Sequence, residues 1–376
     1  MSSPEPAESA APRLPALNLA APKARPHRLL RPYRISARSF FAIAGILVFI
    51  LALQTIKAGA KSLVPLLADL NVSGPLNTVG FGWLFAYIVL SGSPVAAIGI
   101  SLLAGGTFSE TEAFAVVGGS RLGASFIVLA VGFVLYLRGK RNADGLSIGV
   151  IALLTTFTTQ GPAILLGLAV LHFGWLDPVQ FATPAGLLDI IDSTYGPPVT
   201  WLRDLLPDGL VFVAGVGILM ASFTLFDRAL PQLQSEAEGI ERALHFLHRR
   251  PLMFLMGCAI TTLTMSVSIS LTVLVPLALK GYVRRDNIIP YVMGANITTF
   301  IDTLFASVLL GGDRAFTVVL TEMVSVAAIS LLILAAFYGP YSRAILGTSG
   351  WVTAKPRNLG VFLSVIVAVP AVLLFV

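Results

Sequence analysis

The sequence is short of charged residues. Only 12% of its 376 residues are Asp, Glu, Lys or Arg, whereas 56% are hydrophobic; a soluble domain carries about 25% charged residues. The apolar residues also stand in runs of about 17 to 25, the length that crosses a hydrocarbon core of about 30 Å. The low charge and the long runs exclude a water-soluble globular domain and predict an all-α polytopic membrane protein.

Cysteine and catalytic signatures are also scarce. Cys258 is the only cysteine, so no intrachain disulfide is expected, and a lone thiol in an apolar run behaves as a small hydrophobe. His245, His248 and Glu241 have the spacing of metal ligands, but the apolar face of the same segment favours an amphipathic helix on the membrane surface. No nucleophile–base pair or nucleotide-binding loop stands out, so we expect neither an enzyme nor a cofactor.

The net charge of +6 does not indicate a nucleic-acid partner. Much of the excess lies in a basic stretch directly before the apolar run that starts at Phe40, which is the ordinary signal for a cytoplasmic N-terminus beside anionic lipid. Residues 1–22 are rich in Pro, Ala and Ser and predict disorder. A signal peptide cleaved after Ala60 is the alternative, although the apolar run is longer than such a peptide normally has.

Seven segments have the length and composition of membrane-spanning helices. They cover residues 40–56, 112–137, 147–171, 209–226, 288–311, 314–338 and 358–376. Two further stretches, 76–105 and 252–280, are too long for one crossing and are interrupted by small and hydroxyl residues, at Ser91 to Pro94 and at Met265 to Ser270. Unwound backbone at membrane depth survives only inside protein or beside a wet cavity. We interpret both stretches as re-entrant helical hairpins; one long tilted or kinked helix in each place is the alternative.

The hairpin interpretation gives a consistent topology in a plasma or inner membrane. With the N-terminus in the cytoplasm, every basic loop except the turn at Lys57 and Lys61 falls on the cytoplasmic side, and the last helix ends outside. The connection with five Asp residues and one Arg falls outside. The chain then divides into a disordered basic tail (1–38), a first membrane repeat (39–174), an external loop (175–208) and a second membrane repeat (209–376).

The two repeats share a pattern. A serine-bearing break, an apolar return helix, a short loop and a Gly-small-x-Leu/Ile unit recur at nearly constant spacing, with the units at Gly119 to Leu122 and Gly294 to Ile297. We expect each unit to begin a helix. Because the first repeat starts inside and the second outside, the two are inverted, which is typical of alternating-access transporters with a site where broken helices meet.

One of these units also carries a family resemblance. Residues Gly294 to Thr299 read Gly-Ala-Asn-Ile-Thr-Thr, which resembles the Gly-Ala-Asn-Ile-Gly-Thr-Thr motif of type II sodium–phosphate cotransporters. The serine-bearing breaks stand where that family carries Gln-Ser-Ser-Ser, and residues 46–67 resemble its first helix. The resemblance covers residues 40–137 and 209–376.

The resemblance implies where the site lies. In that family the serine motifs and the adjoining units build the substrate and sodium sites. The corresponding residues here are Ser91, Ser93, Ser125, Ser266, Ser268, Ser270, Asn296, Thr298 and Thr299, with sodium implied at Ser266, Ser268, Asn296 and Thr298. Both glutamines are absent, however, and Arg121 stands where the first unit has asparagine. These losses leave sodium coupling and phosphate itself open, and helix packing by small residues is the alternative role.

Three ionisable residues lie within the predicted spans: Arg121, Asp302 and Glu322. A charge there costs about 2.5–3.5 kcal/mol on insertion scales, so it normally faces a cavity or a partner. We place Arg121 near a helix start, where free N–H groups and a guanidinium suit a phosphate-like oxyanion. A structural pair with Asp302, the favoured resting partner, or with Glu322, and a side chain reaching the membrane interface, are the alternatives.

The sequence therefore predicts a secondary active transporter of inorganic phosphate or a related oxyanion, coupled to sodium. The alternatives are proton coupling through Asp302 and Glu322, or an uncoupled anion exporter or channel on the same scaffold. The expected partners are the anion and the lipid bilayer, and a homo-oligomer is left open.

Overall fold

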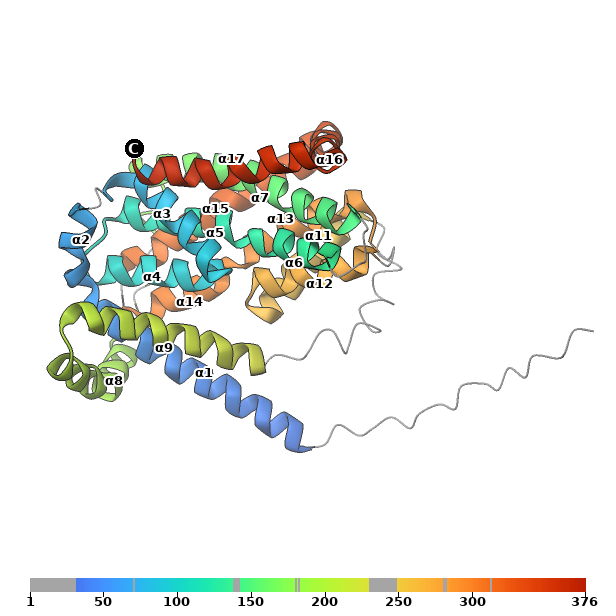
Figure 1. Cartoon of the computed structure of the whole chain (residues 1–376). Coiled ribbons are helices and arrows are strands. Elements are labelled where there is room, and N and C mark those ends of the chain that lie inside the picture. Colours follow the sequence, from blue (N-terminus) through green and yellow to red (C-terminus); the bar gives the residue numbers. More distant parts are fainter. Residues whose placement is uncertain are drawn as a thin grey trace, which may run out of the picture.

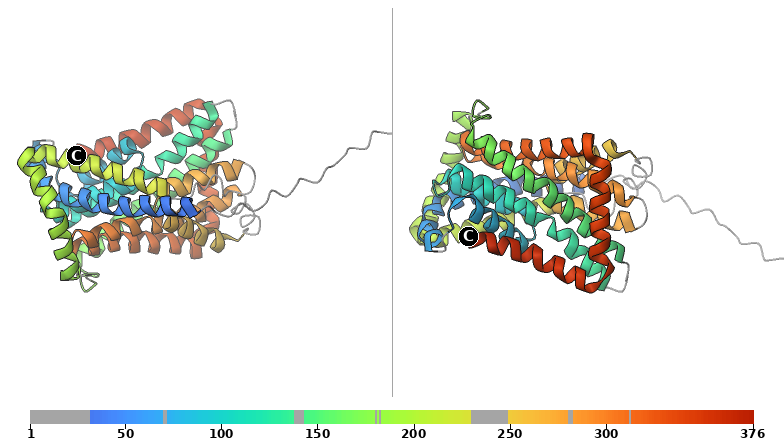
Figure 2. Two further views of the ribbon diagram at one scale, coloured as in Figure 1. Left: turned by 90° about the horizontal axis from the view of Figure 1, so that it is seen from below. Right: turned by 90° about the horizontal axis from the view of Figure 1, so that it is seen from above.

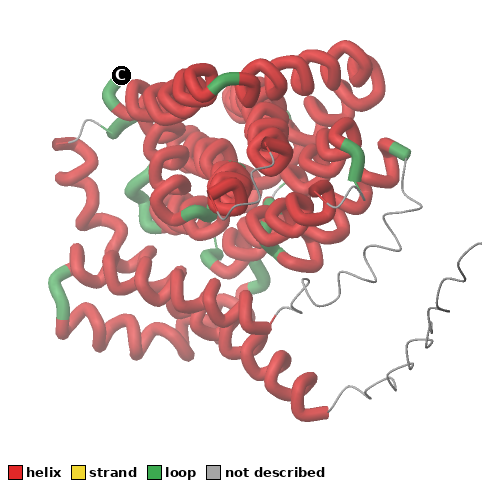
Figure 3. Tube along the Cα trace, turned by 45° about the vertical axis from the view of Figure 1, so that its right-hand side comes forward, coloured by secondary structure: helices red, strands yellow, loops and turns green. Residues whose placement is uncertain are grey.

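The computed structural model describes residues 32–69, 72–137, 143–179, 181, 183–229, 249–279, 283–311 and 313–376. Every regular element in these ranges is a helix (Figure 3). Seven helical stretches are long and apolar enough to cross a membrane, and each overlaps one of the seven predicted segments. The predicted all-α membrane architecture is therefore confirmed. The N-terminal tail to residue 31, the basic loop around Arg141 and the segment with Glu241, His245 and His248 lie outside the described residues.

The described helices fall into two halves on either side of α8. The first half contains α1 (Pro32–Gly59), η1 (Ala60–Ser62), α2 (Leu63–Asp69), α3 (Gly74–Val89), α4 (Gly92–Ala104), α5 (Glu110–Ala124), α6 (Phe126–Leu137) and α7 (Ala143–His172). After α8 (Ala185–Leu205), the second half contains α9 (Asp208–Ala229), α11 (Arg250–Thr264), α12 (Val267–Leu279), α13 (Arg285–Thr298), α14 (Phe300–Leu309), α15 (Asp313–Leu332), a π-helical turn η2 (Ile333–Phe337), α16 (Tyr338–Ala354) and α17 (Pro356–Leu374).

Both predicted breaks are present, and each joins two short helices. Leu90 links α3 to α4 with φ 56°, and Met265 links α11 to α12 with φ 48°. These are the only non-glycine residues with positive φ in the described part of the chain. Left-handed backbone is strained for a residue with a Cβ. Each stretch therefore consists of two helices separated by a left-handed residue and is not one continuous helix.

The two helices of the first pair, α3 and α4, run antiparallel to each other, and both pack against α5. Near the start of α5, Glu112 accepts a hydrogen bond from the backbone N–H of Gly74, the first residue of α3. A Cβ on Gly92, the first residue of α4, would stand 2.7 Å from the Ser120 carbonyl near the end of α5. A Cβ on Gly99 would meet Val116, one turn back. The chain therefore ascends along α5 in α3, turns at Leu90 and descends in α4.

The second pair packs on α13 in the same way. A Cβ on Gly257 of α11 would stand 2.0 Å from the Tyr291 carbonyl, and one on Gly294 of α13 would stand 2.1 Å from the Phe254 carbonyl. The backbones of α11 and α13 therefore touch, and only glycine permits so close an approach. Across the break, Thr261 of α11 donates to Ser270 of α12 at 2.8 Å.

The two predicted Gly-small-x-Leu/Ile units do not begin helices. They lie in the last turns of α5 and α13, and a single residue then separates each helix from the next, Ser125 before α6 and Thr299 before α14. The prediction of helix starts was wrong because the small residues serve close helix packing, whereas the break comes after them. Each predicted span at 112–137 and 288–311 is accordingly a broken helix.

Two connections are more helical than the sequence indicated. The loop predicted at 175–208 contains α8, a 21-residue helix with Ile191 and Val199 buried. The helix predicted at 314–338 continues through the π-helical turn into α16. A period of 3.6 within a polar stretch, as in α8, marks a helix that lies on a surface rather than an extended loop.

α1 and α9 form one side of the molecule. They lie side by side, with Gly45 of α1 against Phe226 near the end of α9 and Ile56 against Gly215, so they run antiparallel (Figure 1). α17 packs on α3 along the opposite side, and α5, α7, α13 and α15 fill the space between (Figure 2). The broken helices therefore sit at the centre of the protein.

Candidate functional site

A cavity of about 810 Å³ lies between the two breaks and the α1–α9 pair. Both breaks contribute to its wall, Leu90 to Pro94 from the first and Thr264 to Ile269 from the second. α1 and α9 supply the facing wall, and Asp302 and Phe305 of α14 complete it. Segments far apart in sequence thus enclose one space, at the junction where the repeat pattern predicts a site.

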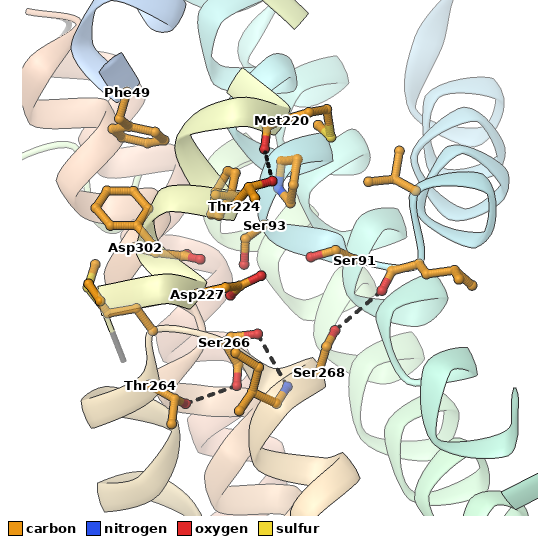
Figure 4. Close-up of a pocket in the computed structure, with 18 of the residues that line it drawn as sticks. Phe49, Ser91, Ser93, Met220, Thr224, Asp227, Thr264, Ser266, Ser268 and Asp302 are labelled. Carbon is orange, nitrogen blue, oxygen red and sulfur yellow. Dashed lines mark hydrogen bonds between the residues drawn. The ribbon is translucent and has the colours of Figure 1, made fainter. Parts of the chain in front are cut away.

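Four serines of the breaks face this cavity: Ser91, Ser93, Ser266 and Ser268 (Figure 4). Ser91 precedes α4, and its side chain makes no capping hydrogen bond with that helix. Ser266 precedes α12 and accepts from the Ile269 N–H at 3.3 Å. Ser268 donates to the Leu90 carbonyl at 3.5 Å, so the two breaks touch. Hydroxyls and the amino ends of two helices therefore meet at one end of the cavity.

Arg121 lies directly behind this end and joins the two halves. Its Nη1 donates to Ser93 at 3.3 Å and to Thr299 at 3.0 Å. Its Nη2 donates to Thr303 at 2.7 Å and pairs with Asp302 at 3.4 Å. The guanidinium also stands 4.7 Å from the Phe300 ring. The predicted pair with Asp302 is present, and Arg121, only 2% exposed, does not line the cavity itself.

The position of Arg121 differs from the prediction of a helix start. Arg121 lies in the last turn of α5, and Asp302 lies in the first turn of α14. A cation at a helix carboxyl end and an anion at an amino end each complement the helix dipole. Their helices thus stabilise both charges.

Two carboxylates line the cavity, Asp302 and Asp227 (Figure 4). Asp302 Oδ2 is buried and has no hydrogen-bond partner among the described residues. Asp227, in the last turn of α9, points into the same space (Figure 4). Sequence reasoning missed Asp227 because the apolar run of this segment ends at Phe226, whereas the helix continues one further turn.

Glu322 is buried away from the cavity. It lies on α15 and receives a hydrogen bond from Gln160 of α7. Glu322 Oε2 and Gln160 Oε1 have no hydrogen-bond partner in the part of the chain that the structure describes. The polar cluster at residues 155–160 contributes Gln160 to this pair, a role that no spacing rule in the sequence indicates.

The remaining predicted residues are divided among other contacts. Ser125 and Asn296 both bond to Thr156 of α7, at 2.6 and 3.0 Å. Ser270 bonds to Thr261 and Tyr291, and Thr298 donates to the Cys258 and Gly294 carbonyls. Of the four residues implied to hold sodium, Ser266 and Ser268 line the cavity, whereas Asn296 and Thr298 do not. Among the described residues no group of three or more His, Cys, Asp and Glu could hold a metal ion.

Comparison with protein-family models, with curated proteins and with solved structures returned no match for this chain.

Proposed function

We propose that the protein is a secondary active transporter that moves a small oxyanion by alternating access. The observation that carries the proposal is the convergence of two strained breaks, Leu90–Ser91 and Met265–Ser266, and of the helices that follow them, on one cavity. Left-handed non-glycine residues persist where the surroundings impose them, and they cluster at functional sites. Broken helices at a repeat interface are the usual binding architecture of such transporters.

The order of elements supports an inverted repeat. α1, the α3–α4 pair, α5–α6 and α7 correspond in turn to α9, the α11–α12 pair, α13–α14 and α15. Counterparts pack together in two places, α1 with α9 and α7 with α15. If both hairpins are re-entrant and the N-terminus is cytoplasmic, the loops that carry Arg284 and Arg343 lie on the cytoplasmic side. The two halves then cross the membrane in opposite directions.

The cavity offers the chemistry that an oxyanion requires. The amino ends of α4 and α12 present N–H groups and a positive dipole, and four serine hydroxyls add donors. Arg121 reaches the site through Ser93, to which it donates. Because Arg121 is paired with Asp302, its charge polarises Ser93 without a free cation in the cavity. Arg121 in this proposal orients the site and does not act as the principal anion contact.

Asp227 supports coupling to a cation. Its carboxylate has no ion pair or hydrogen bond within the described residues, and it faces the space that the anion enters. An anion beside an ionised carboxylate is repelled. A sodium ion or a proton on Asp227 removes that repulsion, so the two solutes enter together. The separation of Asn296 and Thr298 from the cavity favours the proton as the coupling ion.

Uptake into proteoliposomes tests the proposal. Phosphate, sulfate and arsenate are offered with a sodium gradient, a proton gradient or none, to wild-type protein, Ser268→Ala and the control Ser193→Ala. Ser193 lies on α8 and bonds only to its own helix. We expect gradient-driven uptake of an oxyanion that Ser268→Ala weakens and Ser193→Ala leaves unchanged. Uptake that no gradient accelerates would favour an uncoupled channel, and no uptake of any anion would reject the transporter.

A further inference from the structure

The cavity is large and mostly apolar. At about 810 Å³ it matches sites that enclose drug-sized molecules, which span about 300–1,000 Å³. Fourteen of its twenty-three lining residues are apolar, four of them phenylalanines. A bare tetrahedral oxyanion, the size of a few water molecules of about 30 Å³ each, leaves most of this wall without a contact.

The apolar wall is concentrated on α1 and α9. Phe49 of α1 packs edge to face with Phe223 at 5.8 Å and lies 5.9 Å from Phe226. Phe223 and Phe226 are 6.0 Å apart. The three rings form one aromatic surface, with Ile46 and Met220 beside it. The serines, in contrast, belong to the breaks across the cavity (Figure 4). The cavity therefore has an aromatic wall on α1 and α9, which also carries Thr224 and Asp227, and a serine-bearing wall at the breaks.

The charges around the cavity limit how much negative charge it accepts. None of the described residues that line it is Lys or Arg. Arg121 behind the serine-bearing wall is already balanced by Asp302. A multiply charged head has no free cation to compensate the loss of its hydration. A head of low charge with an apolar body gains from burial of that body instead.

We propose that the substrate is an amphiphilic organic oxyanion, with its head at the break serines and its apolar body against the aromatic surface of Phe49, Phe223 and Phe226. This inference rests on the proposed function and narrows the class of anion. The occupant is a water-soluble small molecule, in keeping with a cavity of drug-like size.

The experiment varies the body and keeps the head. Methane-, butane- and hexanesulfonate, which each carry one negative charge, are compared with inorganic phosphate for binding to the purified full chain and for uptake into proteoliposomes. We expect affinity to rise about four-fold for each methylene that the wall buries. Phe223→Ser should flatten this rise, and Phe223→Leu should keep most of it. Phe173→Ser, which removes an exposed ring stacked on Trp175 outside the cavity, is the matched control and should behave as wild type.

The outcomes separate the inference from the function beneath it. Uptake of phosphate with no gain along the alkyl series overturns the inference and leaves the transporter in place. No binding or uptake of any anion rejects both. Tighter binding of alkylammonium ions than of anions with the same alkyl chains would show that the site prefers a cationic head, which overturns the proposal. Exchange of a fluorescent phospholipid between leaflets, without uptake of soluble anions, identifies a membrane lipid as the occupant and also overturns the proposal. Thermal unfolding of each Phe223 variant shows whether a loss reflects misfolding.

Discussion

At the scale of single residues, Arg121 is the side chain that ties the halves together. It extends from α5 to Thr299, Asp302 and Thr303 at the junction of α13 and α14. Its planar fork serves several partners at once, which the point charge of a lysine does not reproduce. The role of Arg121 is therefore geometric as well as electrostatic.

Substitution of Arg121 should separate stability from transport. Arg121→Ala leaves the buried Asp302 unpaired, and we expect a loss of about 3–5 kcal/mol in unfolding free energy. Arg121→Lys should weaken transport although the charge is kept. Adding Asp302→Ala to Arg121→Ala should restore much of the stability without restoring transport. Thermal unfolding and uptake measure the two effects. Recovery of full transport in the double variant would mean that the pair has only a structural role.

Asp227 should determine the coupling of the two solutes. Asp227→Asn keeps the shape of the side chain and removes its charge, so the anion should bind without a cation and uptake should no longer follow the sodium or proton gradient. Asp208→Asn at the opposite end of α9, where the carboxylate pairs with Arg203 on the surface, is the control. Unchanged gradient dependence in Asp227→Asn would place the coupling ion elsewhere.

Part of the site was predictable residue by residue. A charge within an apolar span needs a partner, and this rule led from the sequence to the Arg121–Asp302 contact. Asp227 carries the same kind of charge, but it follows the apolar run, where a solvated loop is the ordinary expectation. The contacts of Asn296 and Thr298 with α7 and α11 depend on helix packing, which sequence spacing does not determine.

At the scale of elements, glycines allow the first helix of each pair to pack closely on a neighbouring helix, α3 on α5 and α11 on α13. Gly82 and Gly119 bring α3 and α5 together, and Gly257 and Gly294 do the same for α11 and α13. Without a hydrophobic force between helices in lipid, such close approach is a main source of association.

A single methyl group should disturb this packing. Gly294→Ala places a Cβ about 2.1 Å from the Phe254 carbonyl, and we expect overpacking to cost about 1–3 kcal/mol. Gly217→Ala, on α9 with no atom within 4 Å of the new Cβ, should be neutral or slightly stabilising, since alanine favours a helix. Thermal unfolding in detergent compares them. Equal midpoints for the two variants would refute the backbone contact.

The breaks show both the strength and the limit of sequence patterns at this scale. Clusters of small and hydroxyl residues located both breaks correctly. The strained residues are Leu90 and Met265, which directly precede the cavity serines Ser91 and Ser266. Neither leucine nor methionine favours left-handed backbone. The contact of Ser268 with the Leu90 carbonyl joins the two breaks across the molecule, and such a tertiary contact has no local signature in the sequence.

At the scale of the whole molecule, the proposed topology determines which side of the membrane the cavity faces. Ala42 of α1 and Ala229 of α9 line the cavity at the end that leads into the cytoplasmic segments under our topology. In the proposed topology this end of the cavity faces the cytoplasm, and the proposed transporter requires a second conformation that opens the cavity to the other side.

Labelling of single cysteines should establish the orientation. In a Cys258→Ser background, Asp192→Cys on α8 should react with an impermeant maleimide in intact cells. Arg249→Cys, just before α11, should react only after the membrane is permeabilised. Labelling of Arg249→Cys from outside would contradict the inverted arrangement, because the second hairpin must start inside.

The seven spans were predictable because bilayer thickness fixes their length. The packing of α1 on α9 was not, since these helices are separated by most of the first repeat and share no paired motif. Only the assembled molecule brings them together to build one wall of the cavity.

That wall has a consequence for how the protein can be produced. Because α1 packs on α9 and α7 packs on α15, contacts between the two halves of the chain join elements from opposite sides of the α8 connection. A gene cut within the segment preceding α8 would yield two polypeptides that each retain a complete set of broken helices. We expect these fragments, expressed together, to find each other through the same two helix pairs. The covalent link between the two halves then ensures that they are made in equal numbers. The bilayer assists their association because it confines both fragments to one plane.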